Sequence, residues 1–231
     1  METQSCPVPY LSSIHYIIRM RLELIDAGTL EYEEALCLQK KIHAQRIAGE
    51  APDTLILLEH PPVITLGRRA DAADVLLAPS LAASRGIKTL RVDRGGEVTY
   101  HGPGQLVGYP ICGIGITAGS VKRFVHCVEE ALIRTLAEGW GITAGRKAEY
   151  TGVWVGEEKI AAIGFSVSRR VTMHGFALNV TTNLEHFSWI VPCGIRAGAV
   201  TSLQKILGKE VSLADVKDRV AAEIKKVFGY E

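Results

Sequence analysis

The chain has 231 residues, of which 47% are hydrophobic and 22% are charged, and its formal net charge at pH 7 is +1. A chain of this length is expected to form one globular domain that buries roughly 70–75% of the unfolded surface. The near-neutral balance gives no global field that would attract nucleic acid or an anionic membrane, and no apolar run approaches the roughly 18 residues that span a bilayer. We therefore expect no nucleic-acid partner and no membrane partner.

Five cysteines stand at positions 6, 37, 112, 127 and 193, without CxxC or CxxH spacing. An odd number with this scatter argues against a disulfide scaffold and against a structural zinc site. Residues 1–13, METQSCPVPYLSS, lack the basic region and continuous apolar stretch of a secretory signal. We expect a loose N-terminal arm over residues 1–13 and a cytoplasmic protein.

The predicted elements begin with a β-favouring stretch over residues 14–19. Thr29 offers a helix N-cap, and the helix that follows ends near Gly49. Residues 54–59, TLILLE, form an apolar run typical of a strand buried on both faces, and a second short run covers 63–66. The apolar stripe of the predicted helix consists of Tyr32, Ala35, Leu38 and Ile42.

Two further helices carry capping signals. The first starts at Ser120 with Gly139 at its C′ position, and its apolar face consists of Val121, Val125, Val128 and Leu132. The second starts at Ser212, where Asp215 completes most of a capping-box pattern. Strands are predicted over 87–93, 106–111, 152–155, 159–163 and 171–180.

The helices are separated by clusters of strands instead of alternating with them. This order favours an α+β fold with a mixed, largely antiparallel sheet over a doubly wound parallel sheet. No repeat or linker interrupts residues 14–228. We expect a single domain over residues 14–231.

The densest glycine signal is the segment from Arg94 to Gln105, RGGEVTYHGPGQ, which stands between two strand-like runs. Four glycines and one proline indicate unusual backbone torsions or the close approach of another group. The segment matches neither the GxGxxG fingerprint nor a P-loop. Two interpretations stay open: a loop that lines a ligand site, and a connection that only needs tight turns.

Cys193 stands in IVPCGI, where proline and glycine turn the chain directly after an apolar run. A thiolate is a strong nucleophile, whereas a buried thiol is only a small apolar side chain. The other four cysteines fall in predicted helices, at a strand end or in the N-terminal arm. Cys193 is therefore the candidate nucleophile, with a purely structural thiol as the alternative.

A nucleophilic cysteine needs a nearby base or cation, because its reference pKa is about 8.5. Among the seven histidines, His101 and His174 lie beside glycines in candidate site segments. Lys159 leads into the apolar run IAAIG, which can desolvate the ammonium group and lower its pKa. A solvated surface lysine is the alternative, and sequence spacing alone does not bring Lys159 to Cys193.

Four blocks occur in this order: RGGEVTYHGPGQLVGYP, GVWVGEEKIAAIG, HGFALNV, and IVPCGI with a trailing VTSL. Together they closely resemble the lipoyl(octanoyl) transferase family, and the similarity extends from about Ile14 to the C-terminal helix. The resemblance implies the biotin/lipoate protein ligase-like fold. It also implies transfer of an octanoyl group from octanoyl-acyl carrier protein to a specific lysine of lipoyl domains, in the E2 subunits of 2-oxoacid dehydrogenases and the glycine cleavage H protein.

Carried over residue by residue, the family's acyl-thioester cysteine falls on Cys193 and the lysine that activates it falls on Lys159. One thioester replaces another in the first step and the second step forms an amide from a thioester, so no ATP, metal or other cofactor is expected. Thr151 departs from the family, which often has proline there. The acyl-pocket residues implied by the resemblance are Arg94, Gly95, Gly96, Glu97, Val98, Thr99, Tyr100, His101, Ala162, Ile163, Gly164, Gly175, Phe176 and Ala177.

Three alternatives remain beside this hypothesis. An ATP-dependent lipoate or biotin ligase on the same fold would use the lysine to orient an acyl-adenylate, and the cysteine would be incidental. A lipoyl-domain amidotransferase would prefer a protein-amide donor. A non-catalytic acyl-carrier-binding module would not need Cys193 at all.

Both protein substrates of this family are commonly acidic. A local basic rim is therefore predicted, with scattered solvated arginines as the alternative. The arginines considered for it are Arg68, Arg69, Arg146, Arg169 and Arg170.

Overall fold

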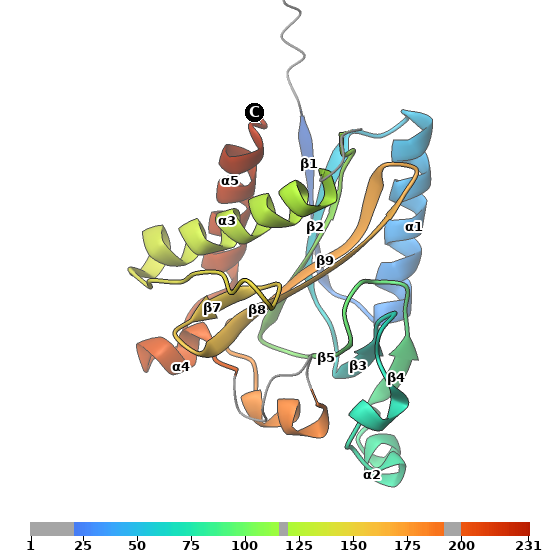
Figure 1. The fold of residues 1–231 in the computed structure, drawn as a ribbon, viewed down its shortest axis with the longest axis vertical. Helices are drawn as coiled ribbons and strands as arrows, with labels where there is room; N and C mark the ends of the chain where they lie inside the picture. The colour runs from blue at the N-terminus through green and yellow to red at the C-terminus, as the bar shows by residue number, and fades with distance from the viewer. Residues whose placement is uncertain (1–20, 116–119, 192–199) are drawn as a thin grey trace, which may run out of the picture.

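The computed structural model describes residues 21–115, 120–191 and 200–231. The predicted arm over residues 1–13 and the predicted strand over 14–19 lie outside these ranges. Two sheets organise the described chain (Figure 1): a six-stranded sheet in the order β1-β2-β6-β9-β8-β7 and a three-stranded sheet in the order β4-β3-β5.

The large sheet confirms the prediction of a mixed, largely antiparallel sheet. β1 and β2 run parallel, and the other four neighbouring pairs are antiparallel. The apolar run TLILLE lies in β2, between the edge strand β1 and β6, and is buried on both faces as predicted. The strands are β1 (Leu22–Thr29), β2 (Asp53–Glu59), β6 (Gln105–Ile111), β7 (Val153–Val155), β8 (Glu158–Ser168) and β9 (Val171–Asn179).

Helices cover both faces of the large sheet (Figure 1). α3 (Ser120–Trp140) and α5 (Leu213–Phe228) pack on one face, where alternate residues such as Leu55 and Leu57 meet them. α1 (Tyr32–Ala48) packs on the other face against Ile56 and Leu58. The period of two along β2 therefore divides its side chains between two cores.

Two predicted helix ends are wrong. Thr29 is the last residue of β1, and the residue before α1 is Glu31, whose side chain makes no capping bond. α3 continues through Gly139 to Trp140, and Gly141 follows with φ 67°. The helix therefore ends before Gly141, the glycine with left-handed backbone torsions, and not before Gly139.

The apolar face of α3 is rotated from the predicted one. Val128 and Leu132 are fully buried, whereas Val121 is 44% exposed. Phe124 and Leu136 take their places in the core. The first turns of α3 therefore leave two valines, Val121 and Val125, for a different surface, described below.

The small sheet was not predicted. Its strands β3 (Val63–Leu66), β4 (Lys88–Arg91) and β5 (Val98–His101) are each four residues long, and they enclose a separate core around Ile64, Val98 and Tyr100. The remaining short elements are a 3₁₀ helix at Ala72–Asp74, α2 (Pro79–Ser84), a 3₁₀ helix at Leu184–Trp189 and α4 (Leu203–Leu207). In the described part of the chain, no helix has the length and apolar character needed to cross a membrane.

Glycines let three strands and one loop approach one another backbone to backbone. Gly164 of β8 pairs with Gly175 of β9. A Cβ on Gly175 would overlap the carbonyl oxygen of Gly108 in β6, and one on Gly164 would lie 2.7 Å from the carbonyl oxygen of Gly95. The absence of side chains at these positions thus sets the spacing between β6, β9, β8 and the loop at Gly95.

Replacing Gly175 with alanine tests this spacing. The added methyl group forces β9 away from the β6 backbone, so we expect the free energy of unfolding in urea to fall by about 1–3 kcal/mol. Gly145→Ala is the matched control, because nothing lies within 4 Å of a Cβ at Gly145 and its φ is not positive. Equal unfolding midpoints for the two variants would contradict the argument.

Candidate active site

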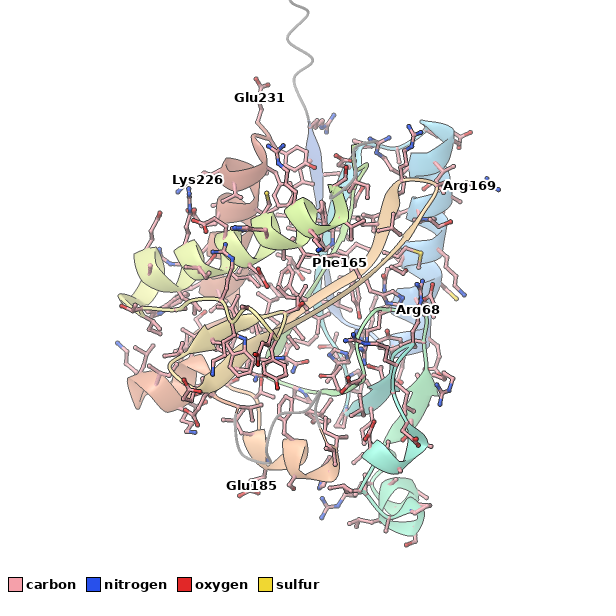
Figure 2. All side chains as sticks on the ribbon, viewed as in Figure 1. Arg68, Phe165, Arg169, Glu185, Lys226 and Glu231 are labelled. Atoms are coloured by element: carbon pink, nitrogen blue, oxygen red, sulfur yellow. The ribbon has the colours of Figure 1, made fainter. Side chains whose placement is uncertain are left out.

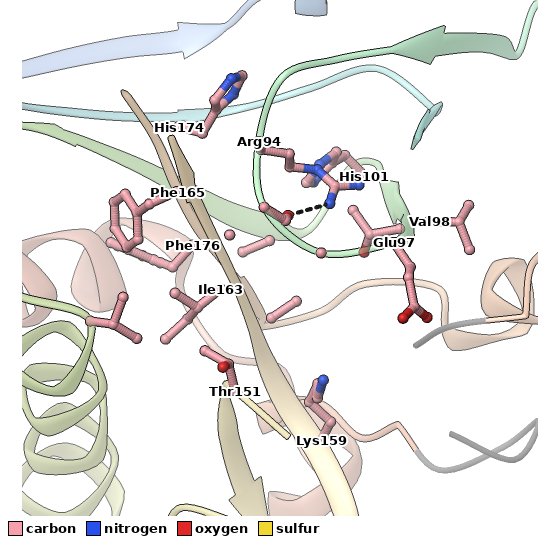
Figure 3. A pocket seen from close by; sticks show the side chains of 18 of the residues that line it. Arg94, Glu97, Val98, His101, Thr151, Lys159, Ile163, Phe165, His174 and Phe176 are labelled. Atoms are coloured by element: carbon pink, nitrogen blue, oxygen red, sulfur yellow. Dashed lines mark hydrogen bonds between the residues drawn. The ribbon is translucent and has the colours of Figure 1, made fainter. Parts of the chain in front are cut away.

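A cavity of about 520 Å³ lies against β8 and β9 and reaches the protein surface. Its exposed border includes Arg69, Val121 and the segment 149–151. Val121 and Val125 of α3 line it, which explains why the first turns of that helix do not join the core. Figure 3 shows Lys159, Ile163 and Phe165 in succession along the cavity side of β8.

The structure gathers nearly all the predicted pocket residues around this cavity. The three predicted segments come from the glycine-rich loop with β5, from β8 and from β9. The lining residues among them are Arg94, Gly95, Gly96, Glu97, Val98, Thr99, His101, Ala162, Ile163, Gly164, Gly175, Phe176 and Ala177, and Lys159 lines the same cavity.

Tyr100 is the exception, because its side chain points away from the cavity. It is 1% exposed and packs in the core of the small sheet, with its ring edge-on to Phe187 and Trp189. Its hydroxyl lies 2.7 Å from Nδ1 of His186. Its neighbour His101 lines the cavity, whereas Tyr100 belongs to the core of the small sheet.

The glycine-rich loop is fixed by its own arginine. The Arg94 guanidinium donates through Nη2 to the backbone oxygen of Thr65 at 2.7 Å and through Nη1 to the oxygen of Gly95 at 3.1 Å (Figure 3). The backbone N–H of Gly95 donates to the oxygen of Phe165 at 2.9 Å. Gly96 has φ 87°, a conformation that favours glycine. The loop therefore forms a fixed wall and not merely a connection between strands.

Lys159 lies at the other end of the cavity wall. Its Nζ is 4.9 Å from the centroid of the Trp154 ring, and the residue is half-buried. Its backbone pairs with Val200, and its carbonyl oxygen accepts the N–H of Thr201 at 3.0 Å. Cys193 lies outside the described residues. Phe187 and Val200, which flank the segment 192–199 in sequence, both line the cavity.

Sequence reasoning missed a cluster of buried aromatic and imidazole rings around the inner part of the cavity. His60 Nε2 lies 2.7 Å from the Tyr109 hydroxyl, and the Tyr32 ring stacks on His101 with 6.0 Å between centroids. In the sequence Tyr32 is part of an apolar helical stripe and His60 has no distinctive context, because only the sheet topology brings α1, β5 and β6 together. Tyr32, His101, Tyr109 and His174 all line the cavity.

His174 has an unusual conformation for a strand residue. Its φ is 61°, its side chain is 1% exposed, and Nε2 lies 2.6 Å from Oδ1 of Asp93. The backbone N–H of His174 donates to Oε1 of Gln39 at 2.9 Å. A left-handed non-glycine residue is strained and persists only when its surroundings hold it. Here Asp93, Gln39 and Tyr32 together hold it.

Burial controls the charge of these rings. It lowers the pKa of His60 and His174, and it lowers the pKa of His101 well below 6.5, with His60 and the Arg94 guanidinium adding to the effect. Burial also raises the pKa of Tyr32 to about 12. The histidine and tyrosine rings of the inner cavity are thus uncharged at physiological pH, and the charge beside them is the Arg94 guanidinium. Among the described residues, no group of three or more His, Cys, Asp or Glu side chains could hold a metal ion.

Comparison with known proteins identifies the family. The model for the lipoyl protein ligase A/B catalytic domain matches residues 31–225. An octanoyltransferase from Caldicellulosiruptor saccharolyticus is 52% identical over 91% of this chain and 90% of its own length. The chain belongs to the octanoyltransferase family. It is therefore an acyltransferase, as the sequence motifs indicated.

Other relatives agree with this assignment. An octanoyltransferase from Alkaliphilus metalliredigens is 50% identical over 92% of this chain and 97% of its own length. The fold is shared with a putative lipoate protein ligase from T. acidophilum with bound lipoic acid, at a TM-score of 0.70 and 16% identity over 93% of this chain and 88% of that one. These findings confirm the predicted family and its lipoate protein ligase fold.

The neutral histidines predict how stability depends on pH. The unfolded chain takes up protons on histidine near pH 6.5, whereas the folded octanoyltransferase resists protonation of His60, His101 and His174. The unfolded state therefore binds more protons, and the free energy of unfolding falls as the pH drops below about 6.5. Carboxylates with lowered pKa, such as Asp26, lose their contribution only at still lower pH.

Urea unfolding at pH 7.5, 6.5 and 5.5 measures this loss. We expect His101→Asn to flatten the decline between pH 6.5 and 5.5, because it removes the most strongly shifted of the three groups while keeping a donor toward Gln105. An unchanged slope in His101→Asn would show that His101 is not held neutral by the fold.

Proposed function

We propose that this octanoyltransferase works through an acyl-enzyme on Cys193. In the first step the Cys193 thiolate attacks the thioester carbonyl of octanoyl-acyl carrier protein, and the carrier's thiol leaves with a proton. In the second step a lysine amine of a lipoyl domain attacks the new thioester, so that the amide forms and the Cys193 thiolate leaves. Lys159 stabilises the thiolate and exchanges the protons of both steps.

The observation that carries the proposal is the course of the cavity wall. An apolar surface of Ile163, Phe165 and Phe176 leads to Lys159, and the backbone of Lys159 pairs with Val200. Val200 follows the segment that contains Cys193. The volume of about 520 Å³ falls in the range of roughly 300–1,000 Å³ that is usual for small-molecule sites. Both features support an acyl chain that enters along β8 with its carbonyl at the Lys159 end.

The proposed acceptors are the lipoyl domains of 2-oxoacid dehydrogenase E2 subunits and the glycine cleavage H protein, and the proposed setting is the cytoplasm. Cys37, Cys112 and Cys127 are free thiols, which supports a reducing compartment. Burial raises the pKa of Cys112 to about 12, so its thiol is inert as a nucleophile. This supports Cys193 over Cys112 as the reactive thiol.

An intact-mass experiment tests the covalent step. After incubation with octanoyl-acyl carrier protein, the wild-type protein should gain the mass of one octanoyl group, and Cys193→Ser should gain none. The paired control is Cys127→Ser, which removes a half-buried thiol in α3 and should keep the adduct. A wild-type protein that never gains mass, or a Cys193→Ser variant that still does, would overturn the mechanism.

The same preparation separates the alternatives on this fold. Pyrophosphate release from ATP with free octanoate would indicate a ligase. Faster transfer from an octanoylated lipoyl-bearing protein than from the carrier protein would indicate an amidotransferase. The first-step chemistry proposed here requires neither ATP nor a protein-amide donor.

The five arginines considered for a basic rim differ in ion pairing and in position. Arg146 is neutralised by Glu129 at 3.1 Å and Glu130 at 2.7 Å. Arg169 and Arg170 form the turn after β8, and ten residues of strand place Arg169 about 30 Å from Lys159. Figure 2 shows Arg169 at the turn between β8 and β9.

Arg68 and Arg69 remain as the charged contact for an acidic carrier protein. Their backbone N–H groups donate to the oxygens of Arg94 and Gly96, each at 3.1 Å, which fixes both residues beside the glycine-rich loop, and Arg69 lines the cavity. Both side chains are exposed, and no carboxylate of the described residues lies within ion-pair distance of either.

Charge reversal tests this contact. We expect Arg69→Glu to raise the KM for octanoyl-acyl carrier protein about threefold to tenfold and to make this KM depend less on salt concentration. The reason is that a charge at the edge of an interface acts mainly on the association rate of the two proteins. Arg169→Glu makes the same change in net charge at the turn of the hairpin, about 30 Å from Lys159, and should leave KM unaltered. The same KM in both variants would show that Arg69 does not contact the carrier.

A further inference from the structure

A buried chain of hydrogen bonds joins the cavity to the residues that follow the Cys193 segment. Nδ1 of His101 lies 2.8 Å from Oε1 of Gln105, and Nε2 of Gln105 donates to Oδ1 of Asn179 at 3.0 Å. Nδ2 of Asn179 then donates to the backbone oxygen of Thr201 at 3.0 Å. Each of the four residues is 6% exposed or less.

The far end of the chain meets Lys159. The N–H of Thr201 donates to the backbone oxygen of Lys159 at 3.0 Å, and Val200 pairs with Lys159 as a one-residue parallel bridge. Thr201 is therefore held through its oxygen by Asn179 and through its nitrogen by Lys159. The chain begins at His101 and ends at Lys159, and both residues line the cavity (Figure 3).

The donors and acceptors along this chain leave only one arrangement. Nε2 of Gln105 donates also to the backbone oxygen of Tyr100 at 3.2 Å, so both of its hydrogens are used and Oε1 must accept. His101 must then carry its proton on Nδ1, which leaves a lone pair on Nε2. Asn179 must offer its oxygen to Gln105 and its amino group to Thr201. A carboxylate at position 179 cannot make the second bond.

We propose that Asn179 and Gln105 are positioning residues for octanoyl transfer. Through Thr201 they set where the chain that follows Cys193 meets Lys159, and through His101 they set which imidazole nitrogen accepts a hydrogen bond. This inference rests on the proposed roles of Cys193 and Lys159. A misplacement of about 1 Å between reacting groups lowers a rate on the order of 100-fold, so small shifts of Thr201 matter.

The test is Asn179→Asp, which keeps the size of the side chain and replaces the donor to Thr201 with an acceptor. Because the carboxylate also adds a charge, Asn179→Leu, which adds none, should shift rate and alkylation profile in the same direction. We expect single-turnover octanoylation of Cys193 to slow about 10-fold to 100-fold, with an unchanged KM for octanoyl-acyl carrier protein. The pH profile for alkylation of Cys193 by iodoacetamide should shift to higher pH, because Lys159 no longer stabilises the thiolate as well. A residue that only supports the fold would lower the thermal midpoint without moving this profile.

Asn183→Asp is the matched control. Asn183 is exposed and caps the 3₁₀ helix Leu184–Trp189 by accepting the N–H of Glu185 at 3.0 Å, a bond that a carboxylate makes equally well. This variant should keep both the wild-type rate and the wild-type alkylation profile.

A double-mutant cycle shows whether the two amides act as one chain. Gln105→Met and Asn179→Leu each remove one amide, and the double variant should lose little more rate than the more impaired single variant. Where Asn179→Asp lacks a cooperative unfolding transition, Gln105→Met takes its place in the rate and alkylation measurements. Fully additive losses, or a variant with the wild-type octanoylation rate and alkylation profile, would overturn this inference alone. A wild-type protein without an octanoyl adduct would overturn the proposed function and this inference together.

Discussion

The close approach of four backbone segments is the constraint on which the site depends. Gly108, Gly175, Gly164 and Gly95 follow one another across β6, β9, β8 and the glycine-rich loop, and a Cβ at Gly175 or Gly164 would meet the backbone of the next segment. Gly95, Gly164 and Gly175 border the cavity, and none of them places a side chain in it. The same absence of Cβ atoms therefore brings the loop against β8 and leaves room beside it. A bulkier sheet would have neither the loop wall nor the space for an acyl chain.

Within that space, burial separates neutral groups from charged ones. The histidines at the inner end lose their positive charge because desolvation lowers the pKa of each. Lys159 lies at the other end of the wall, half-buried beside the Trp154 ring. A thiolate needs a cation close to it, whereas an alkyl chain needs an uncharged surface. The cavity provides these two environments at different points along β8, which supports the proposed acyl transfer through a thioester.

Sequence patterns predicted the elements that carry strong local signals. The continuous run of β2, the strand predicted over 171–180, which is β9, and the Ser212 cap of α5 all appear as expected. The run over 63–66 and the strand over 87–93 were predicted and form β3 and β4, but β5 lies inside the glycine-rich segment, and no local pattern shows that these three short strands pair in a sheet of their own. The family resemblance pointed to the loop and the two strands of the cavity, but not to the direction of each side chain, as Tyr100 shows. Tyr32 joins the site only because α1 crosses the sheet there, a contact that no local pattern contains.

The four motifs lie far apart in the sequence, yet two amide side chains and two backbone groups from them meet in one buried chain of hydrogen bonds. Gln105, Asn179, Thr201 and Lys159 come from four separate blocks, and each makes a hydrogen bond to the next. An amide buried without its partner costs about 1–3 kcal/mol, so the loss of one member leaves its neighbours unsatisfied. The hydrogen bonds of such a chain therefore form cooperatively. This property suits a site whose reacting groups sit on different segments, because one arrangement of the chain is then much more stable than any other.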